Sequence, residues 1–266
     1  MQRPCVRSIT ALLAPLTALA LLAAPASAES PAYSPDTQYV AMGDSFSSGL
    51  GAPGATVDCG RSPQGYPTLW ANAHGITKFT DVTCGGAVTD DVLAEQISGL
   101  NAETDVVTIT IGGNDTAWGD QVLTCMLSGD TACTDTVDEA VAGLPAVATK
   151  VDATYAAMRQ AAPNAKVYVL GYPNLFEETA GCAAWAVPNQ YQRKELNRFA
   201  SALNQSLARS AAKAGFSFTD AQPFFAGHAV CSSQSWINPV LALPPLHPNA
   251  DGYRLGYLAA LNSATG

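Results

Sequence analysis

At residues 105–115 the chain reads Asp-Val-Val-Thr-Ile-Thr-Ile-Gly-Gly-Asn-Asp. The first part, over 105–111, is dense in β-branched side chains, which favour a strand within a sheet. The last part, Gly112 to Asp115, is a turn-forming sequence that displays the side chain of Asn114. The stretch therefore predicts a strand that ends in a polar, glycine-bearing loop.

Strands and helices alternate on both sides of this stretch. Strands are predicted over 38–42, 78–83, 105–111, 166–170 and 216–218. Helices are predicted over 65–74, 88–100, 137–162, 190–214 and 250–261, with Gly215 ending the fourth and Asn249 capping the last. This alternation predicts an α/β fold in which a central parallel sheet carries helices on both faces. The sequence has no internal repeat and no long linker, so one domain is expected.

Two more of the predicted strands end as the first one does. The strand over 38–42 stops at Gly43-Asp44-Ser45, and the strand over 78–83 stops at Cys84-Gly85-Gly86. Ligands of open parallel sheets bind in the crevice beyond the carboxyl ends of the strands. The three loops are therefore expected to converge on one site.

The N-terminal residues have the pattern of a secretory signal peptide. Arg3 and Arg7 precede an apolar run over 9–24, and Ala26-Ser27-Ala28 follows it. Pro15 interrupts the run and no stop-transfer pattern follows, so no stable membrane anchor is expected. We expect residues 1–28 to be removed by cleavage after Ala28, which leaves a secreted domain over 29–266.

The chain is acidic, with a formal net charge of −9 that becomes more negative once Arg3 and Arg7 are removed. Such a surface repels phosphate backbones, so no nucleic acid partner is expected.

The cysteine count is even outside the leader. Removal of Cys5 from the 7 cysteines leaves an even set in an exported chain, which favours disulfides over metal ligands. No Cys-x-x-Cys and no His pair at ligand spacing occurs, so no metal site is expected. The spacing leaves the connectivity open. We favour pairing of neighbours along the chain: Cys59–Cys84, Cys125–Cys133 and Cys182–Cys231.

The residue types at the three loops suit acyl transfer. A serine in a tight turn exposes its hydroxyl and its own N–H, glycine lets the backbone approach a substrate oxygen, and asparagine adds uncharged N–H donors. Such donors stabilise the oxyanion that develops during attack on an ester. A base for the Ser45 hydroxyl is also needed, and His247, in Leu246-His247-Pro248-Asn249, is the candidate.

These motifs resemble those of the SGNH/GDSL hydrolases. Gly43-Asp44-Ser45-Phe46-Ser47-Ser48-Gly49 is similar to their first block; Gly86, Gly112-Gly113-Asn114-Asp115 and His247-Pro248-Asn249 are similar to their second, third and fifth, in the same chain order. Within this family, the pattern of cysteines and the motif Phe225-Ala226-Gly227-His228 resemble more narrowly the secreted bacterial lipases and esterases. The resemblance implies a flavodoxin-like three-layer α/β/α sandwich and catalytic Ser45 and His247. It also implies oxyanion donors from the Ser45 N–H, the Gly86 N–H and the Asn114 side chain.

Several alternatives remain at this site. Gly85 competes with Gly86 as an oxyanion donor. Asp44 is expected to stabilise its turn rather than orient the histidine, and Asp115 to cap the following segment. His228 is a weaker candidate for the base than His247.

One position departs from the family pattern. Many members have an aspartate three residues before the histidine, where this chain has Pro244. We therefore expect a Ser45–His247 dyad in which a main-chain carbonyl near Pro244 or Pro245 orients the imidazole.

The predicted function is a secreted serine ester hydrolase, a lipase or carboxylesterase that acts on lipid or simple acyl esters, phospholipid acyl chains included. It needs no cofactor and is expected to be a monomer. One alternative is a polysaccharide O-acetyl esterase, because the same site could remove acetyl groups. The other is a non-catalytic secreted binding domain.

Overall fold

A computed structural model of the chain describes residues 1–2, 33–179, 182 and 187–266. The predicted signal peptide lies outside these residues apart from its first two. The chain divides into two compact units, Met1–Ser30 and Pro31–Gly266. Every helix and strand given below belongs to the second unit.

A five-stranded parallel sheet forms the centre of this unit. Its strands are β1 (Gln38–Gly43), β2 (Lys78–Asp81), β3 (Val106–Thr110), β4 (Lys166–Leu170) and β5 (Ser217–Thr219). They lie in the order β2-β1-β3-β4-β5, which is the flavodoxin-like order, and every neighbouring pair is parallel. The predicted parallel sheet is therefore confirmed.

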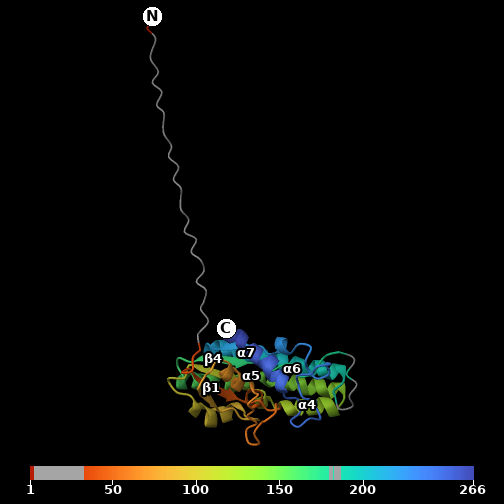
Figure 1. Cartoon of the computed structure of the whole chain (residues 1–266). Coiled ribbons are helices and arrows are strands. Elements are labelled where there is room, and N and C mark those ends of the chain that lie inside the picture. Colours follow the sequence, from red (N-terminus) through yellow and green to blue (C-terminus); the bar gives the residue numbers. More distant parts are fainter. Residues whose placement is uncertain (3–32, 180–181, 183–186) are drawn as a thin grey trace. The chain divides into compact units, whose positions relative to one another are not determined.

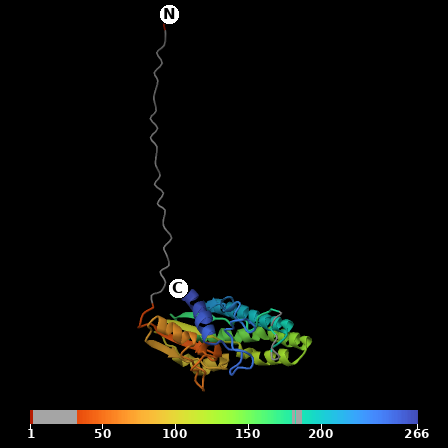
Figure 2. The ribbon, with the colours of Figure 1, turned by 45° about the vertical axis from the view of Figure 1, so that its right-hand side comes forward.

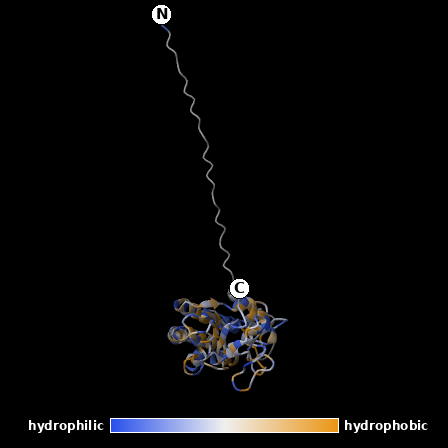
Figure 3. Ribbon diagram, turned by 60° about the vertical axis from the view of Figure 1, so that its left-hand side comes forward, coloured by the Kyte–Doolittle hydropathy of each residue, from blue (hydrophilic) through white to orange (hydrophobic). Residues whose placement is uncertain are grey.

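The long helices pack in two groups. On one side α2 (Tyr66–Ala73) contacts η5 (Gly252–Tyr257) and α7 (Leu258–Thr265); on the other α5 (Asp130–Ala161) runs along α6 (Gln190–Ala214). Figures 1 and 2 show helices on both sides of the strands, which gives the predicted α/β/α layers. Hydrophobic and hydrophilic residues alternate along the helices (Figure 3), as expected of helices that pack one face against a sheet.

Two predicted helices are interrupted. The segment predicted over 88–100 consists of α3 (Thr89–Asp91), the π-helical η1 (Val92–Gln96) and the 3₁₀ turn η2 (Ile97–Gly99). The amide of Gln96, at the end of η1, bonds both backbone groups of Gly43, donating to its oxygen at 3.0 Å and accepting from its nitrogen at 2.7 Å. The wider π turn thus places this side chain on the end of β1. The segment predicted over 250–261 begins as the π-helical η5 and continues as α7.

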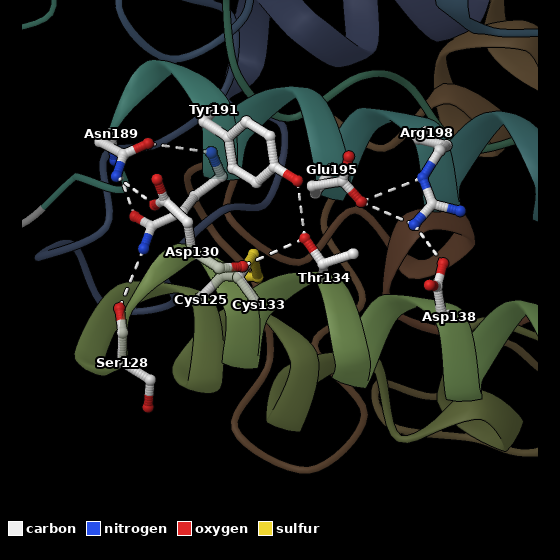
Figure 4. Close-up of a disulfide and its surroundings, with 11 residues drawn as sticks. Cys125, Ser128, Asp130, Cys133, Thr134, Asp138, Asn189, Tyr191, Glu195 and Arg198 are labelled. Atoms are coloured by element: carbon white, nitrogen blue, oxygen red, sulfur yellow. Dashed lines mark hydrogen bonds and ion pairs between the residues drawn. A yellow bond between two sulfur atoms is a disulfide. The ribbon is translucent and has the colours of Figure 1, made fainter.

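The helix α4 (Trp118–Leu127) was not predicted, and α5 begins at Asp130 rather than at residue 137. The disulfide Cys125–Cys133 joins the two helices across the short turn between them. Figure 4 shows this disulfide beneath the first turns of α6, where Asn189 bonds Asp130 at 2.7 Å and Tyr191 bonds Thr134 at 2.8 Å. These links hold α4 and α5 against α6.

All three predicted disulfide pairs are present: Cys59–Cys84, Cys125–Cys133 and Cys182–Cys231. Within the described ranges, no helix combines the length and apolar character needed to cross a bilayer.

Candidate active site

The turn after β1 presents Ser45 at the carboxyl end of the sheet. Gly43 ends the strand with φ +112°, and a side chain here would collide with the carbonyl oxygen of Thr110 on β3, so only glycine fits. Asp44 then caps α1 (Ser45–Ser48), accepting a hydrogen bond from the Phe46 nitrogen at 2.9 Å. Ser45 is the first residue of that helix, and a helix leaves its first backbone N–H groups without an intrahelical partner.

The Ser45 hydroxyl meets the imidazole of His247. Ser45 Oγ lies 2.9 Å from His247 Nε2, and His247 Nδ1 lies 2.7 Å from the carbonyl oxygen of Pro245. A carbonyl oxygen only accepts, so Nδ1 carries the proton and Nε2 is left to accept the hydrogen bond from the serine. Of the two carbonyls that the sequence left open, the one facing the imidazole is therefore that of Pro245.

Burial sets the charge of this histidine. It lowers the pKa of His247, and the hydrogen bond to Pro245 opposes that shift only in part. The imidazole is therefore neutral near pH 7, which is the form that accepts a proton.

The loop that carries His247 is tied to the loop after α1. Asn238 donates its backbone N–H to the His247 oxygen at 2.8 Å and its side-chain amide to the Gly51 oxygen at 2.9 Å. Leu246 completes the pairing by donating to the Asn238 oxygen at 3.2 Å, and it adopts φ +57°. These bonds fix the position of the His247 backbone relative to the loop that follows Ser45.

The loops after β2 and β3 are in direct contact. Asn114 begins η3 (Asn114–Thr116), and its Nδ2 donates to the Ala87 oxygen at 2.9 Å, which uses one of its two N–H groups. Gly86 is exposed with φ +82°, a conformation that favours glycine. The Gly85 N–H is already bonded to the Cys59 oxygen at 2.8 Å, which leaves Gly86 as the better candidate of the two.

The acids beside Ser45 and Asn114 bond groups other than the imidazole of His247. Asp44 accepts hydrogen bonds from the Phe46 nitrogen and the Tyr172 hydroxyl, and burial raises its pKa to about 7. Asp115 accepts from the Thr89 nitrogen at 3.0 Å, so it caps α3 and not the segment that follows it.

The other two histidines, His74 and His228, pack against tryptophans and bond backbone carbonyls. The ring of His228 stacks on Trp236 with 3.6 Å between centroids, and its Nδ1 bonds the Gln234 oxygen. His74 bonds the Trp70 oxygen at the end of α2. Across the described ranges, no group of three or more His, Cys, Asp or Glu side chains could hold a metal ion.

An apolar cavity of about 510 Å³ opens beside Ser45 and His247. Asn114 also lines it, and its apolar walls come mainly from α4, α6 and the loop before His247: Trp118, Val122, Leu123, Met126, Phe199, Leu203, Val240, Leu241 and Leu246. Trp118 is thus a wall residue, whereas Trp236 packs on His228. The wall formed by α4 was not foreseen, because no helix was predicted over these residues.

Exposed leucines, called the leucine rim below, lie on two of the elements that form the cavity walls. Leu123 and Leu127 on α4 are 53% and 75% exposed, and Leu241 and Leu243 on the loop before His247 are 66% and 97% exposed. Leu123 and Leu241 also line the cavity, so the apolar surface continues from its interior onto the outside of the molecule.

Comparisons with known proteins identify the family of the chain. Residues 41–255 match the model of the GDSL-like Lipase/Acylhydrolase family. The chain is 42% identical to a lipase of Streptomyces rimosus, over 93% of this chain and 94% of that one, and 39% identical to Lipase 1 of Streptomyces coelicolor, over 85% and 86%. Among solved structures, a phospholipase A1 from Streptomyces albidoflavus superposes with a TM-score of 0.82 at 39% identity, covering 86% of this chain and 99% of that one. The extracellular lipase of Streptomyces rimosus superposes with a TM-score of 0.81, at the same coverage.

Proposed function

Since the chain belongs to the GDSL-like lipase/acylhydrolase family and is therefore an ester hydrolase, we propose that Ser45 is its nucleophile and His247 its general base. The observation that carries this assignment is the continuous chain of hydrogen bonds from the Pro245 carbonyl through His247 to Ser45 Oγ. An acyl-transfer dyad needs this order: an acceptor that fixes the tautomer, a neutral imidazole, and a hydroxyl within reach of it.

The proposed reaction has two steps. His247 Nε2 takes the proton of Ser45 as Oγ attacks the ester carbonyl carbon, and His247 returns that proton to the departing alcohol. Water, deprotonated by the same imidazole, then attacks the acyl-enzyme, and the carboxylic acid and Ser45 are released.

In both steps the substrate carbonyl oxygen carries negative charge in the tetrahedral intermediate. We assign its stabilisation to the Ser45 N–H, the Gly86 N–H and the Nδ2 proton of Asn114 that is not bonded to Ala87.

The proposed substrates are esters of long acyl chains, phospholipids included. The cavity beside Ser45 is lined mainly by apolar side chains, and the leucine rim extends this surface outward. Burial of apolar surface contributes roughly 25 cal/mol per Å², so each further methylene of an acyl chain in this cavity adds affinity. A phospholipase A1 among the similar structures is consistent with such substrates.

We also propose that the protein is exported after cleavage near Ala28 and acts as a secreted monomer. The three disulfides support export, because disulfides persist in oxidising compartments. N-terminal sequencing of the protein recovered from culture medium tests the cleavage, and light scattering tests the monomer.

The central experiment is hydrolysis of p-nitrophenyl esters from acetate to palmitate by the mature protein, with Ser45→Ala as control. We expect turnover that is lost in the control and that favours the longer chains. Turnover confined to acetate would favour the alternative of a polysaccharide O-acetyl esterase. Equal turnover by the Ser45→Ala variant would refute the assignment of the nucleophile.

A further inference from the structure

Tyr172, on the loop after β4, joins the nucleophile turn to the loop of Asn114. Its hydroxyl donates to Asp44 Oδ2 at 2.5 Å and accepts a hydrogen bond from the Gly113 nitrogen at 2.9 Å. Asp44 immediately precedes Ser45, and Gly113 immediately precedes Asn114. One phenol group therefore links the two backbone segments whose spacing sets the distance between the nucleophile and the proposed oxyanion donor.

The tyrosine is itself held rigidly. Its backbone nitrogen donates to Asn204 Oδ1 at 2.9 Å, and Asn204 Nδ2 donates back to the Tyr172 oxygen at 2.8 Å. Its ring packs edge-on against Phe46 with 5.2 Å between centroids. A Cβ on Gly113 would lie 2.9 Å from the phenol oxygen, so glycine is what allows this close approach.

The direction of the hydrogen bonds follows from charge. Burial, and then the neighbouring Asp44, raise the pKa of Tyr172 well above its ordinary value, so the phenol keeps its proton and donates it to the carboxyl group. Its oxygen lone pairs then remain to accept the Gly113 N–H. Both partners are buried, so removal of the hydroxyl would leave Asp44 Oδ2 and the Gly113 N–H without this hydrogen bond.

We propose that Tyr172 is a positioning residue for ester hydrolysis, whose hydroxyl holds the Asn114 loop at a fixed distance from Ser45. The proposal rests on the proposed function, since it presumes that Asn114 binds the oxyanion. Donors of this kind act only within about 2.7–3.1 Å of the developing charge, and a misplacement of about 1 Å can cost about a hundredfold in rate. Tyr172 acts through Gly113 and Asp44 rather than through a contact with the reacting atoms.

The test is a double-mutant cycle of Tyr172→Phe and Asn114→Ala, measured with p-nitrophenyl butyrate. Tyr172→Phe keeps the ring packing on Phe46 and removes only the hydroxyl. We expect it to lower kcat by roughly 10- to 100-fold and to change KM by less than about threefold, because it disturbs an interaction made in the transition state. In the Asn114→Ala background the same substitution is expected to lower kcat by less than about threefold, since the donor that it positions is already absent.

Two variants separate positioning from stability. Tyr66→Phe removes another buried tyrosine hydroxyl beside the same turn, one that bonds Ser47 at 3.2 Å. It is expected to leave kcat within about threefold of the parent. If Tyr172→Phe is unfolded at the assay temperature, Asp44→Asn replaces it in the cycle. That variant weakens the same link but keeps the tyrosine, and it is expected to show a smaller loss with the same dependence on Asn114.

Each outcome decides the proposal. An equal loss of kcat in both backgrounds, or an equal loss in Tyr66→Phe, would show that Tyr172 only stabilises the fold, and the inference would fail alone. Parental kcat in Asn114→Ala would instead refute the oxyanion assignment of the proposed function, and the role of Tyr172 would fall with it.

Discussion

Replacing Asp251 with asparagine is expected to leave turnover unchanged, because a main-chain carbonyl orients His247. Asp251 is the acid nearest to His247 along the chain, but its carboxylate is paired with Arg254 at 2.8 Å, and both side chains are more than half exposed. The position facing His247 Nδ1 is filled by the Pro245 oxygen at 2.7 Å. Substitution of such an exposed side chain changes free energies by about 0.5 kcal/mol, so kcat is expected to stay within about two- to threefold of the parent.

The competing mechanism predicts a very different result. Where an acid orients the imidazole of a serine hydrolase, its replacement by the amide lowers kcat by about 10⁴-fold, or about 5.4 kcal/mol. The assay is kcat on p-nitrophenyl butyrate for the parent and for Asp251→Asn, with Asp220→Asn as the second acid of this region. Asp220 bonds Asn204 and Gln222, so its variant is first checked for folding.

The pH profile gives an independent check on the same point. Burial lowers the pKa of His247, and the imidazolium form cannot accept the serine proton. Activity is therefore expected to rise with pH through a midpoint below the ordinary histidine value of about 6.5. A loss of several orders of magnitude in either aspartate variant, or a midpoint that moves further down when one acid is removed, would refute the carbonyl mechanism.

Three further predictions follow from other parts of the structure. Replacing both Cys59 and Cys84 with serine is expected to lower the free energy of unfolding, measured by urea denaturation, by about 3.5 kcal/mol. This value is the loop entropy that the disulfide removes from the unfolded chain at a sequence separation of 25. Substituting Leu123 and Leu241, the two exposed leucines that line the cavity, with serine is expected to lower activity on phosphatidylcholine vesicles at least about fivefold more than activity on soluble p-nitrophenyl butyrate, since each buried leucine contributes about 1.5–3 kcal/mol. Burial raises the pKa of Asp44 to about 7, so between about pH 4 and 7 the folded state binds a proton that the unfolded state has lost, and the free energy of unfolding falls as the pH rises. The Asp44→Asn variant is expected to lack this fall when its free energy of unfolding is measured by urea titration at several pH values.

Each of these has its own control. For the rim, Leu93→Ser with Leu255→Ser alters two exposed leucines that do not line the cavity, and an equal effect of that pair on vesicles would contradict a role for the rim. For the disulfide, an unchanged urea midpoint in the double-serine variant would contradict the expected loss of stability from loop entropy. For Asp44, a variant whose stability keeps the pH slope of the parent would assign that slope to other groups.

The positions of the strands along the chain and the composition of their loops were predictable because both depend on local sequence. The β-branched run over 105–111 and its counterparts identify buried strands, and alternation with helices restricts the sheet to parallel pairing. A parallel sheet brings the ends of its strands to one edge, so Ser45 and Asn114 could be placed in the same region without any knowledge of long-range contacts. Pairing of neighbouring cysteines was favoured from chain order, and the structure has these three pairs, but the spacing alone left the connectivity open.

What the sequence could not decide depends on partners far away along the chain. The group that orients His247 is a backbone carbonyl, which every residue has, so no residue type marks it. The tie between Tyr172 and Asp44 joins residues 128 positions apart. The cavity walls come from α4, α6 and the loop before His247, which are far apart in the sequence. Residue types and spacing therefore determined the class of sheet and the chemistry at its edge. Only the tertiary structure decided the tautomer of His247, the shape of the cavity and the spacing of the loops, because these depend on which distant groups meet once the chain is packed.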